Sequence, residues 1–192
     1  MIALDGRRAI HRRALAWTGA QIAAITPADL DRPTPCTAWS LRDLVGHMTS
    51  HNRGFTLALS GTPEGAEIWD NLDPGSDAAK AYEATSGELT AAFAGETPQR
   101  IEVYGYGTFG IMTVIGMHII DVVAHGWDVA RALGLDRMPD DDLCEAAYEI
   151  MRGFPDERPN QAFDVVVPVP DDAPIGPRLM GWLGRDPGWQ PS

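Results

Sequence analysis

Residues 109–135 form the most apolar stretch of the chain, and this stretch constrains the fold more than any other feature of the sequence. It is long enough to span a membrane as a helix, since about 20 apolar residues cross a bilayer. It also contains five ionisable side chains: His118, Asp121, His125, Asp128 and Arg131. Because such side chains are costly to bury in hydrocarbon, the stretch predicts a helix in the interior of a soluble protein and no membrane partner.

Apolar residues at three- and four-residue steps predict further helices on both sides of this stretch. The predicted helices cover about residues 3–25, 40–59, 76–94, 111–133 and 140–152, with a last short helix at 174–183. At the start of the second helix, Ser40 and Asp43 have the spacing of a capping box, with Asp in place of the usual Glu. Residues 62–75 are expected to be a loose connection, and residues 100–110 a short strand or an extended crossover.

Four substantial amphipathic helices, no internal repeat and a single candidate strand predict an all-α fold. The expected architecture is a four-helix bundle with a short C-terminal extension. We expect one domain over residues 1–192, with the bundle at about 3–153 and a C-terminal wrap at about 154–192. The wrap carries four large apolar side chains that we expect to pack on the bundle: Leu179, Trp182, Leu183 and Trp189.

The charge balance and the cysteines restrict the partners and the compartment. Fifteen Lys and Arg against 27 Asp and Glu give a net charge of −12, and such a field repels nucleic acids and anionic lipids. Cys36 and Cys144 lie far apart in the sequence, so we expect neither a disulfide framework nor a four-thiolate zinc site. Arginines interrupt the N-terminal segment, which predicts no secretory signal. We therefore expect a cytoplasmic protein that acts on a small molecule and binds no nucleic acid.

Four ionisable residues share one face of the apolar helix: His118, Asp121, His125 and Asp128. Their spacing of i, i+3, i+7 and i+10 places them within about 80° of arc on an α-helix. Burial of two imidazoles and two carboxylates costs several kcal/mol unless the groups are paired or coordinated. The pattern is therefore interpreted as a metal site or as a buried hydrogen-bond network, and chance alignment gives a third reading. Asp128 and Arg131 are expected to form a salt bridge.

The second helix carries two more histidines, His47 and His51, which lie on neighbouring rows of that helix and could both point into the bundle. His47 falls in register with Leu44 and Met48, toward the expected core, whereas the residues after His51 are polar. A His from one helix with an Asp/His pair from another is a typical metal site of helical bundles. Three protein ligands leave a coordination position open, as in catalytic zinc sites, but two histidines and one carboxylate also suit non-haem iron.

Three other residues near these motifs have alternative interpretations. Cys36 precedes a helix N-terminus, where thiolates are stabilised, although a small buried Cys in a turn is the more common case. Trp39 and Trp127 flank the candidate site and could form the walls of a pocket. The sequence contains no glycine-rich phosphate loop after a strand, no Gly-x-Ser-x-Gly and no Cys-x-x-Cys, which argues against most nucleotide, hydrolase and redox templates.

Two stretches resemble a known family when they are taken together. The first is Pro-Thr-Pro-Cys-Thr-Ala-Trp-Ser-Leu-Arg-Asp-Leu-Val-Gly-His, which ends at His47. The second is Asp-Val-Val-Ala-His-Gly-Trp-Asp-Val-Ala-Arg-Ala-Leu-Gly, which begins at Asp121. They resemble the actinobacterial metal-binding branch of the DinB-like superfamily, close to the N-terminal domain of mycothiol-dependent maleylpyruvate isomerase. The tail, with Pro-Val-Pro-Asp-Asp-Ala-Pro and then Leu-Gly-Arg-Asp-Pro, is similar to the ending of that branch.

The resemblance implies a bundle that holds a divalent metal, usually zinc, with Fe²⁺ and Ni²⁺ as alternatives. His47 matches the first ligand, Asp121 the acidic ligand and His125 the last ligand. The isomerase has a Glu at the acidic position, so the shorter Asp121 must reach the ion. His118 is no ligand position of the pattern, and it could be a fourth ligand, an acid/base group or a neighbour in the core. We take it as the candidate catalytic residue.

The leading hypothesis is a metal-dependent enzyme that activates mycothiol or a similar thiol, or water, for S-transfer or isomerisation of a small electrophilic molecule. The isomerase has a further C-terminal domain that this chain is too short to contain, so maleylpyruvate is not the expected substrate. Two rivals are a metal-binding sensor or interaction module, with a closed coordination sphere and no cavity, and a thiol-independent metalloenzyme of specialised metabolism, with an aromatic pocket. The resemblance also allows a homodimer.

Overall fold

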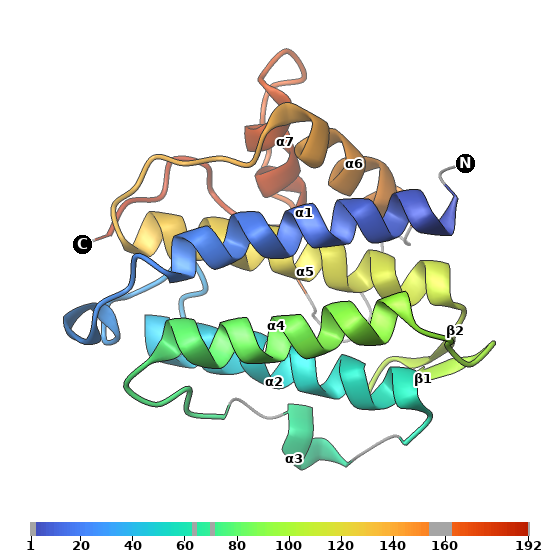
Figure 1. Ribbon diagram of the computed structural model, residues 1–192. Helices are drawn as coiled ribbons and strands as arrows, with labels where there is room; N and C mark the ends of the chain where they lie inside the picture. Colours follow the sequence, from blue (N-terminus) through green and yellow to red (C-terminus); the bar gives the residue numbers. More distant parts are fainter. Residues whose placement is uncertain (1–2, 63–64, 70–71, 154–162, 192) are drawn as a thin grey trace.

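Four long helices form the body of the molecule in the computed structural model, which describes residues 3–62, 65–69, 72–153 and 163–191 (Figure 1). They are α1 (Leu4–Ile22), α2 (Leu41–Ser60), α4 (Ala78–Ala94) and α5 (Ile111–Ala132). Shorter helices are α3 (Ala66–Trp69), α6 (Asp141–Met151) and α7 (Ile175–Trp182), with a 3₁₀ turn at Pro27–Asp29. The all-α prediction is confirmed, and helix ends differ from the expected ones by a few residues.

The long helices are arranged as two pairs, α1 beside α5 and α2 beside α4 (Figure 1). Smaller contacts join α1 to α4 and α2 to α5, which closes the group of four. The apolar helix predicted at residues 111–133 is the most buried, with sixteen buried residues. Burial of one Leu, Ile or Val side chain contributes about 1.5–3 kcal/mol, so this helix contributes a large part of the core. No helix in the described ranges is long and apolar enough to cross a membrane.

The start of α2 is fixed by the capping box predicted from the sequence. The Ser40 hydroxyl accepts from the Asp43 amide at 3.3 Å, and the Asp43 carboxylate accepts from the Ser40 amide at 3.0 Å. The helix ends at Gly61, whose φ of 77° is the left-handed conformation that glycine adopts without strain. The two caps thus fix the length of α2, Leu41–Ser60.

Residues 101–109 form a hairpin. Strand β1 (Ile101–Val103) pairs antiparallel with β2 (Gly107–Phe109), with Ile101 opposite Phe109. The expected short strand is present as β1, the alternative of an extended crossover is wrong, and the partner strand β2 was not expected. The turn between them has positive φ at Gly105, which a non-glycine side chain would strain. Three-residue strands show no periodicity in a sequence, which is why the second strand was missed.

Residues 163–191 lie against the helices of the bundle. Helix α7 packs on α6, and Leu179 and Leu183 are fully buried, as the expected wrap requires. Residues 154–162, with which that wrap was expected to begin, lie outside the described residues. The run after α7 carries Arg185 back to α5, where the guanidinium donates to Asp128 at 2.9 Å.

Candidate metal centre

Three imidazoles surround the carboxylate of Asp121 between α2 and α5. Asp121 Oδ1 lies 3.7 Å from His47 Nε2 and 3.4 Å from His125 Nε2. Its Oδ2 lies 3.8 Å from His51 Nδ1. The structure thus brings together His47, Asp121 and His125, the three residues matched to metal ligands, and adds His51 to them.

The carboxylate of Asp121 is poorly satisfied by the protein itself. N–H···O hydrogen bonds span about 2.7–3.2 Å, and all three imidazole distances are longer. Oδ2 is buried and has no hydrogen-bond partner. Ligand atoms about 2.0–2.1 Å from a tetrahedral zinc are about 3.3 Å from one another, close to the spacings from Oδ1 to His47 and His125. His47, His51 and Asp121 offer ligand atoms that all lie within 4.8 Å of one another, and His125 Nε2 is 3.4 Å from the same carboxylate. The residues present therefore fit a divalent cation.

Asp121 and His125 each shift the pKa of the other toward its charged form. Burial alone would raise the pKa of Asp121, but the neighbouring His125 and His47 imidazoles hold that pKa well below its usual range. Burial alone would lower the pKa of His125, but Asp121 and Asp128 raise it well above its usual range. In this arrangement the two side chains form an ion pair, which a cation would replace with release of a proton from His125.

A second carboxylate, that of Asp128, contacts the ring nitrogen of His125 that does not face Asp121. Asp128 Oδ2 lies 3.0 Å from His125 Nδ1, and Asp128 is fully buried. When Nδ1 carries the proton and donates it to Asp128, the lone pair of Nε2 points to Asp121, which is the tautomer that a metal-binding histidine needs. Burial alone would raise the pKa of Asp128, but Arg185 and His125 lower it to about 2.

The partner of Asp128 differs from the expected one. Its carboxylate accepts from Arg185 at Nε (3.3 Å) and Nη2 (2.9 Å), and the predicted pair with Arg131 is wrong. Arg131 instead pairs with Asp136 at 2.8 Å and lies over the Trp127 ring. The long reach of the C-terminal segment explains the difference, because it places a second arginine closer to Asp128 than the one a turn away on α5.

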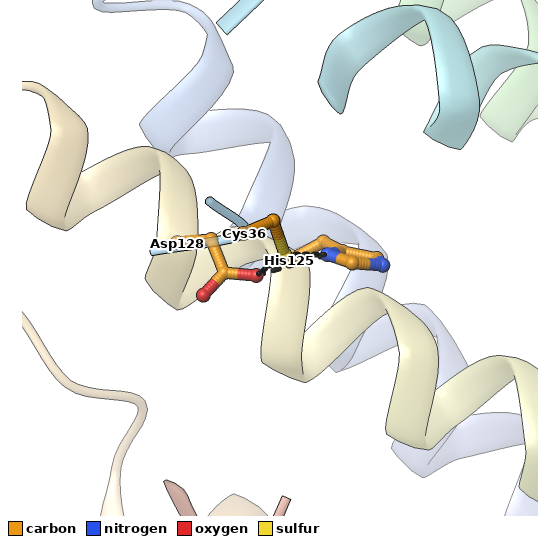
Figure 2. Close-up of side chains that lie close together, drawn as sticks. All are labelled: Cys36, His125 and Asp128. Atoms are coloured by element: carbon orange, nitrogen blue, oxygen red, sulfur yellow. Dashed lines mark hydrogen bonds and ion pairs between the residues drawn. The ribbon is translucent and has the colours of Figure 1, made fainter. Parts of the chain in front are cut away.

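Cys36 lies at the edge of the same group. Figure 2 shows its sulfur beside the imidazole of His125 and the carboxylate of Asp128. Sγ is 3.3 Å from Asp128 Oδ2, 4.0 Å from His125 Nδ1 and 3.5 Å from Arg185 Nη2. The thiol is half-buried and donates to Asp128, so it belongs to the groups that hold His125 in place.

His118 shares the face of α5 on which Asp121 and His125 lie, but its two ring nitrogens contact residues outside this group. It is fully buried, its Nδ1 is 3.0 Å from His11 Nε2, and its Nε2 is 3.0 Å from Asn52 Oδ1. Burial lowers the pKa of His118 to about 4. The side chain does not border the cavity described below.

A cavity of about 460 Å³ opens beside the candidate ligands. Trp39 lies over His47 with ring centroids 4.5 Å apart, and Trp69 meets the edge of His51 at 5.4 Å. Both tryptophans line the cavity. The rest of its wall is also largely apolar and includes Phe55, Tyr106, Met117, Ile120, Met151 and Phe163. Trp127 is buried in the core and does not line the cavity. Of the two tryptophans expected near the site, one therefore forms a wall.

The sequence profile of the mycothiol maleylpyruvate isomerase N-terminal domain matches residues 11–130. The chain belongs to this family. The match includes both candidate ligand helices, so the resemblance drawn from the two motifs is confirmed. It ends before α6, α7 and Arg185.

Two proteins of Mycobacterium tuberculosis are similar over nearly the whole chain. They are Uncharacterized protein MT0763 of strain CDC 1551 / Oshkosh and Uncharacterized protein Rv0738 of strain ATCC 25618 / H37Rv. Each is 28% identical over 185 residues, which cover 91% of this chain and 95% of the relative. The similarity therefore extends beyond residues 11–130, which the family domain covers.

Solved structures show the same fold. The crystal structure of the mycothiol-dependent maleylpyruvate isomerase has a TM-score of 0.62 at 16% identity, and that of its histidine-to-alanine mutant has 0.61 at 15%. Each comparison covers 78% of this chain and 68% of the solved chain. The DinB-like fold predicted from the sequence is confirmed.

Two residues of the candidate site were not among the predicted ligands. The sequence left the direction of His51 open, because Asn52 and Arg53 make the helix polar after it. A signal was present, since His51 is one turn after His47 and shares its side of the helix. Arg185 lies within the Leu-Gly-Arg-Asp-Pro run that resembles the family ending, but its partner Asp128 is 57 residues away. That separation leaves no pattern in a single sequence.

Proposed function

We propose that this protein is a metal-dependent enzyme that adds a low-molecular-weight thiol, with mycothiol as the first candidate, to a small electrophilic molecule. The ligands are His47, Asp121 and His125, and zinc is the first candidate ion. The observation that carries the proposal is the Asp121 carboxylate, which lies among three imidazoles beside a cavity and whose Oδ2 has no hydrogen-bond partner.

The protein's own groups have distinct tasks in this proposal. When bound, a divalent cation supplies the charge that makes a coordinated thiol a nucleophile near neutral pH. Asp128 keeps a proton on His125 Nδ1, and Arg185 holds Asp128 in position. His51 borders the cavity, and burial lowers its pKa to about 3. A neutral imidazole at that place can orient the S–H group of an incoming thiol by a hydrogen bond.

The reaction needs no external oxidant or reductant. Addition of R–SH to an activated C=C bond forms one C–S bond and one C–H bond, and the thiol proton ends on the neighbouring carbon. Rotation about the new single bond followed by loss of R–SH restores the double bond with the opposite geometry. S-transfer stops after the addition, whereas isomerisation includes the elimination.

The cavity favours a substrate with an apolar body. Its aromatic walls offer stacking surfaces, and within the described residues Arg185 is the one basic side chain that borders it apart from the histidines. The Arg185 guanidinium already donates to Asp128 and to the Leu183 carbonyl. A dicarboxylate would therefore compete with Asp128 for this arginine, which agrees with the expectation that maleylpyruvate is not the substrate.

The two rival functions differ in their support. A sensor was expected to have a closed coordination sphere, for instance with His118 as a fourth ligand, and no cavity beside the ion. Two observations count against the sensor: His118 Nε2 is hydrogen-bonded to Asn52, and a cavity of about 460 Å³ lies beside the candidate ligands. A thiol-independent metalloenzyme remains the second candidate, because aromatic walls are the feature expected for it. The single-domain division and the homodimer stay predictions.

A thiol-consumption assay separates the two enzyme candidates. Zinc-loaded protein is incubated with mycothiol and a panel of electrophiles that contains an aromatic α,β-unsaturated ketone and maleylpyruvate, and adducts and isomers are measured by mass spectrometry and chromatography. We expect turnover of the aromatic compound that requires both thiol and metal and is lost in His47→Ala. Turnover at the same rate without thiol would favour the second candidate, and no turnover in any combination would contradict both for this panel.

A further inference from the structure

A chain of buried hydrogen bonds crosses the interior and takes one residue from each of the four long helices. His11 on α1 contacts His118 on α5 at 3.0 Å, and His118 contacts Asn52 on α2 at 3.0 Å. Asn52 Nδ2 donates to the Thr85 hydroxyl on α4 at 3.1 Å. All four side chains are at most 3% exposed. The chain therefore links both helix pairs through the centre of the molecule.

The donor and acceptor of each hydrogen bond can be assigned by starting from Thr85, the last residue of the chain. The Thr85 hydroxyl donates to backbone carbonyls of its own helix at 3.2 Å, so it accepts from the Asn52 amide nitrogen. The Asn52 oxygen then faces His118 and accepts from His118 Nε2–H. In a neutral His118 with its proton on Nε2, Nδ1 is an acceptor, and it accepts a hydrogen bond from His11 Nε2–H. Each of the three contacts in the chain is thus a donor paired with an acceptor.

This arrangement lies directly beside the proposed ligands. His118 is one turn before Asp121 on α5, and Asn52 follows His51 on α2. Helices α2 and α5 belong to different pairs and share a smaller interface than either pair does. The bond between Asn52 and His118 is thus a specific polar link between the two helices that carry the ligands.

We propose that the hydrogen-bonded chain His11–His118–Asn52–Thr85 is a positioning device that sets the alignment of α2 and α5, and with it the geometry of the metal ligands. The proposal rests on the proposed function, because it takes His47, Asp121 and His125 as ligands. Buried polar groups give little net stability compared with apolar side chains of similar shape. A polar link does, however, select one alignment, because a shift of one helix leaves a donor and an acceptor unpaired in the core.

The test compares two variants that break the chain at neighbouring bonds. Asn52→Leu removes the link between α2 and α5, whereas the matched control, Thr85→Val, breaks the bond to α4 and leaves that link in place. Asn52→Ser leaves room for a water molecule and serves as a milder variant if Asn52→Leu does not fold. Melting temperatures report the loss of stability in each.

The first readout uses the metal-free protein. Imidazole ¹H–¹⁵N NMR spectra give the positions and tautomers of His47, His51 and His125. We expect these signals to move in the Asn52 variants and to stay in place in Thr85→Val, and we expect His118 of the wild type to carry its proton on Nε2. Unchanged signals in both Asn52 variants would overturn the proposal.

The second readout is the binding of zinc and cobalt to the same proteins. Loss of a group that orients ligands typically weakens metal binding about 10–100-fold, so we expect the zinc Kd of Asn52→Leu to rise at least about tenfold more than that of Thr85→Val, with a changed cobalt absorption band. Equal Kd values for the two would also overturn the proposal. A wild type that binds no zinc would refute the proposed function instead, and the imidazole spectra would still decide the positioning role.

Discussion

Replacement of Asp128 by asparagine removes the charge that joins His125 to the C-terminal segment. Asp128 is fully buried, and Arg185 is 8% exposed. In Asp128→Asn the guanidinium of Arg185 keeps its charge and loses its counter-ion in the interior. Removal of one partner of a buried ion pair costs about 3–5 kcal/mol. For a chain of this size 1 kcal/mol corresponds to about 2–4 °C in Tm, so we expect Tm to fall by roughly 6–20 °C.

The same substitution acts on metal binding through His125. Asparagine can still accept from His125 Nδ1, but without charge, so the imidazole loses the partner that increases its basicity. We expect the zinc Kd to rise about 10–100-fold. Differential scanning fluorimetry of metal-free protein gives Tm, and competition with a chromophoric chelator gives Kd.

A surface pair provides the control for this experiment. Glu149 and Arg152 are 3.2 Å apart, and both side chains are more than half exposed. Such pairs contribute about 0–1 kcal/mol, so Glu149→Ala should change Tm by a few degrees at most and leave Kd unchanged. A Kd for Asp128→Asn equal to that of the wild type would refute the argument that Asp128 orients His125. A Tm equal to that of Glu149→Ala would refute the argument that Arg185 needs its counter-ion.

Two further predictions concern the start of α2 and the wall of the cavity. Hydrogen bonds from Ser40 lower the pKa of Asp43. The charged carboxylate therefore stabilises the fold above its unfolded pKa of about 3.9, and this contribution is lost as the pH falls through the folded pKa. In urea unfolding, Asp43→Asn should lower the free energy of unfolding by about 0.3–1 kcal/mol at pH 7 and leave it unchanged at about pH 2, and a difference independent of pH would contradict this. A Cβ at Gly54 would lie 2.5 Å from the Trp69 ring, so Gly54→Ala should displace Trp69 and destabilise the protein by about 1–3 kcal/mol. The same variant should bind an aromatic ligand more weakly, with an unchanged zinc Kd. Unchanged ligand affinity in calorimetry would show that Trp69 is not part of the binding wall.

The helices were predictable because their signals are local. The spacing of Ser40 and Asp43 determines a helix start, and the apolar repeat of α5 extends over six turns, so both are visible without knowledge of the fold. The hairpin and α3 depend on contacts instead. Helix α3 has four residues and is held by Trp69, whose ring lies 5.2 Å from Phe55. No periodic pattern exists at such lengths.

The residues of the candidate site were predictable as far as they lie one turn apart on a helix. Asp121 and His125 satisfy that condition, and the family motifs added His47. The polar residues after His51 did not decide its direction, because α2 is covered by α4, α5 and α3 and thirteen of its residues are buried, polar ones included. Arg185 depends on the path of the C-terminal segment, which single-sequence patterns do not describe.

The metal content of the protein, purified without added metal and without a histidine tag, tests the central claim most directly. Wild type and His125→Ala are measured side by side by inductively coupled plasma mass spectrometry, and circular dichroism verifies that both are folded. The account predicts close to one equivalent of zinc or another divalent ion per wild-type chain and almost none in the variant. A folded wild type that holds no ion and takes up none on addition of zinc would contradict it.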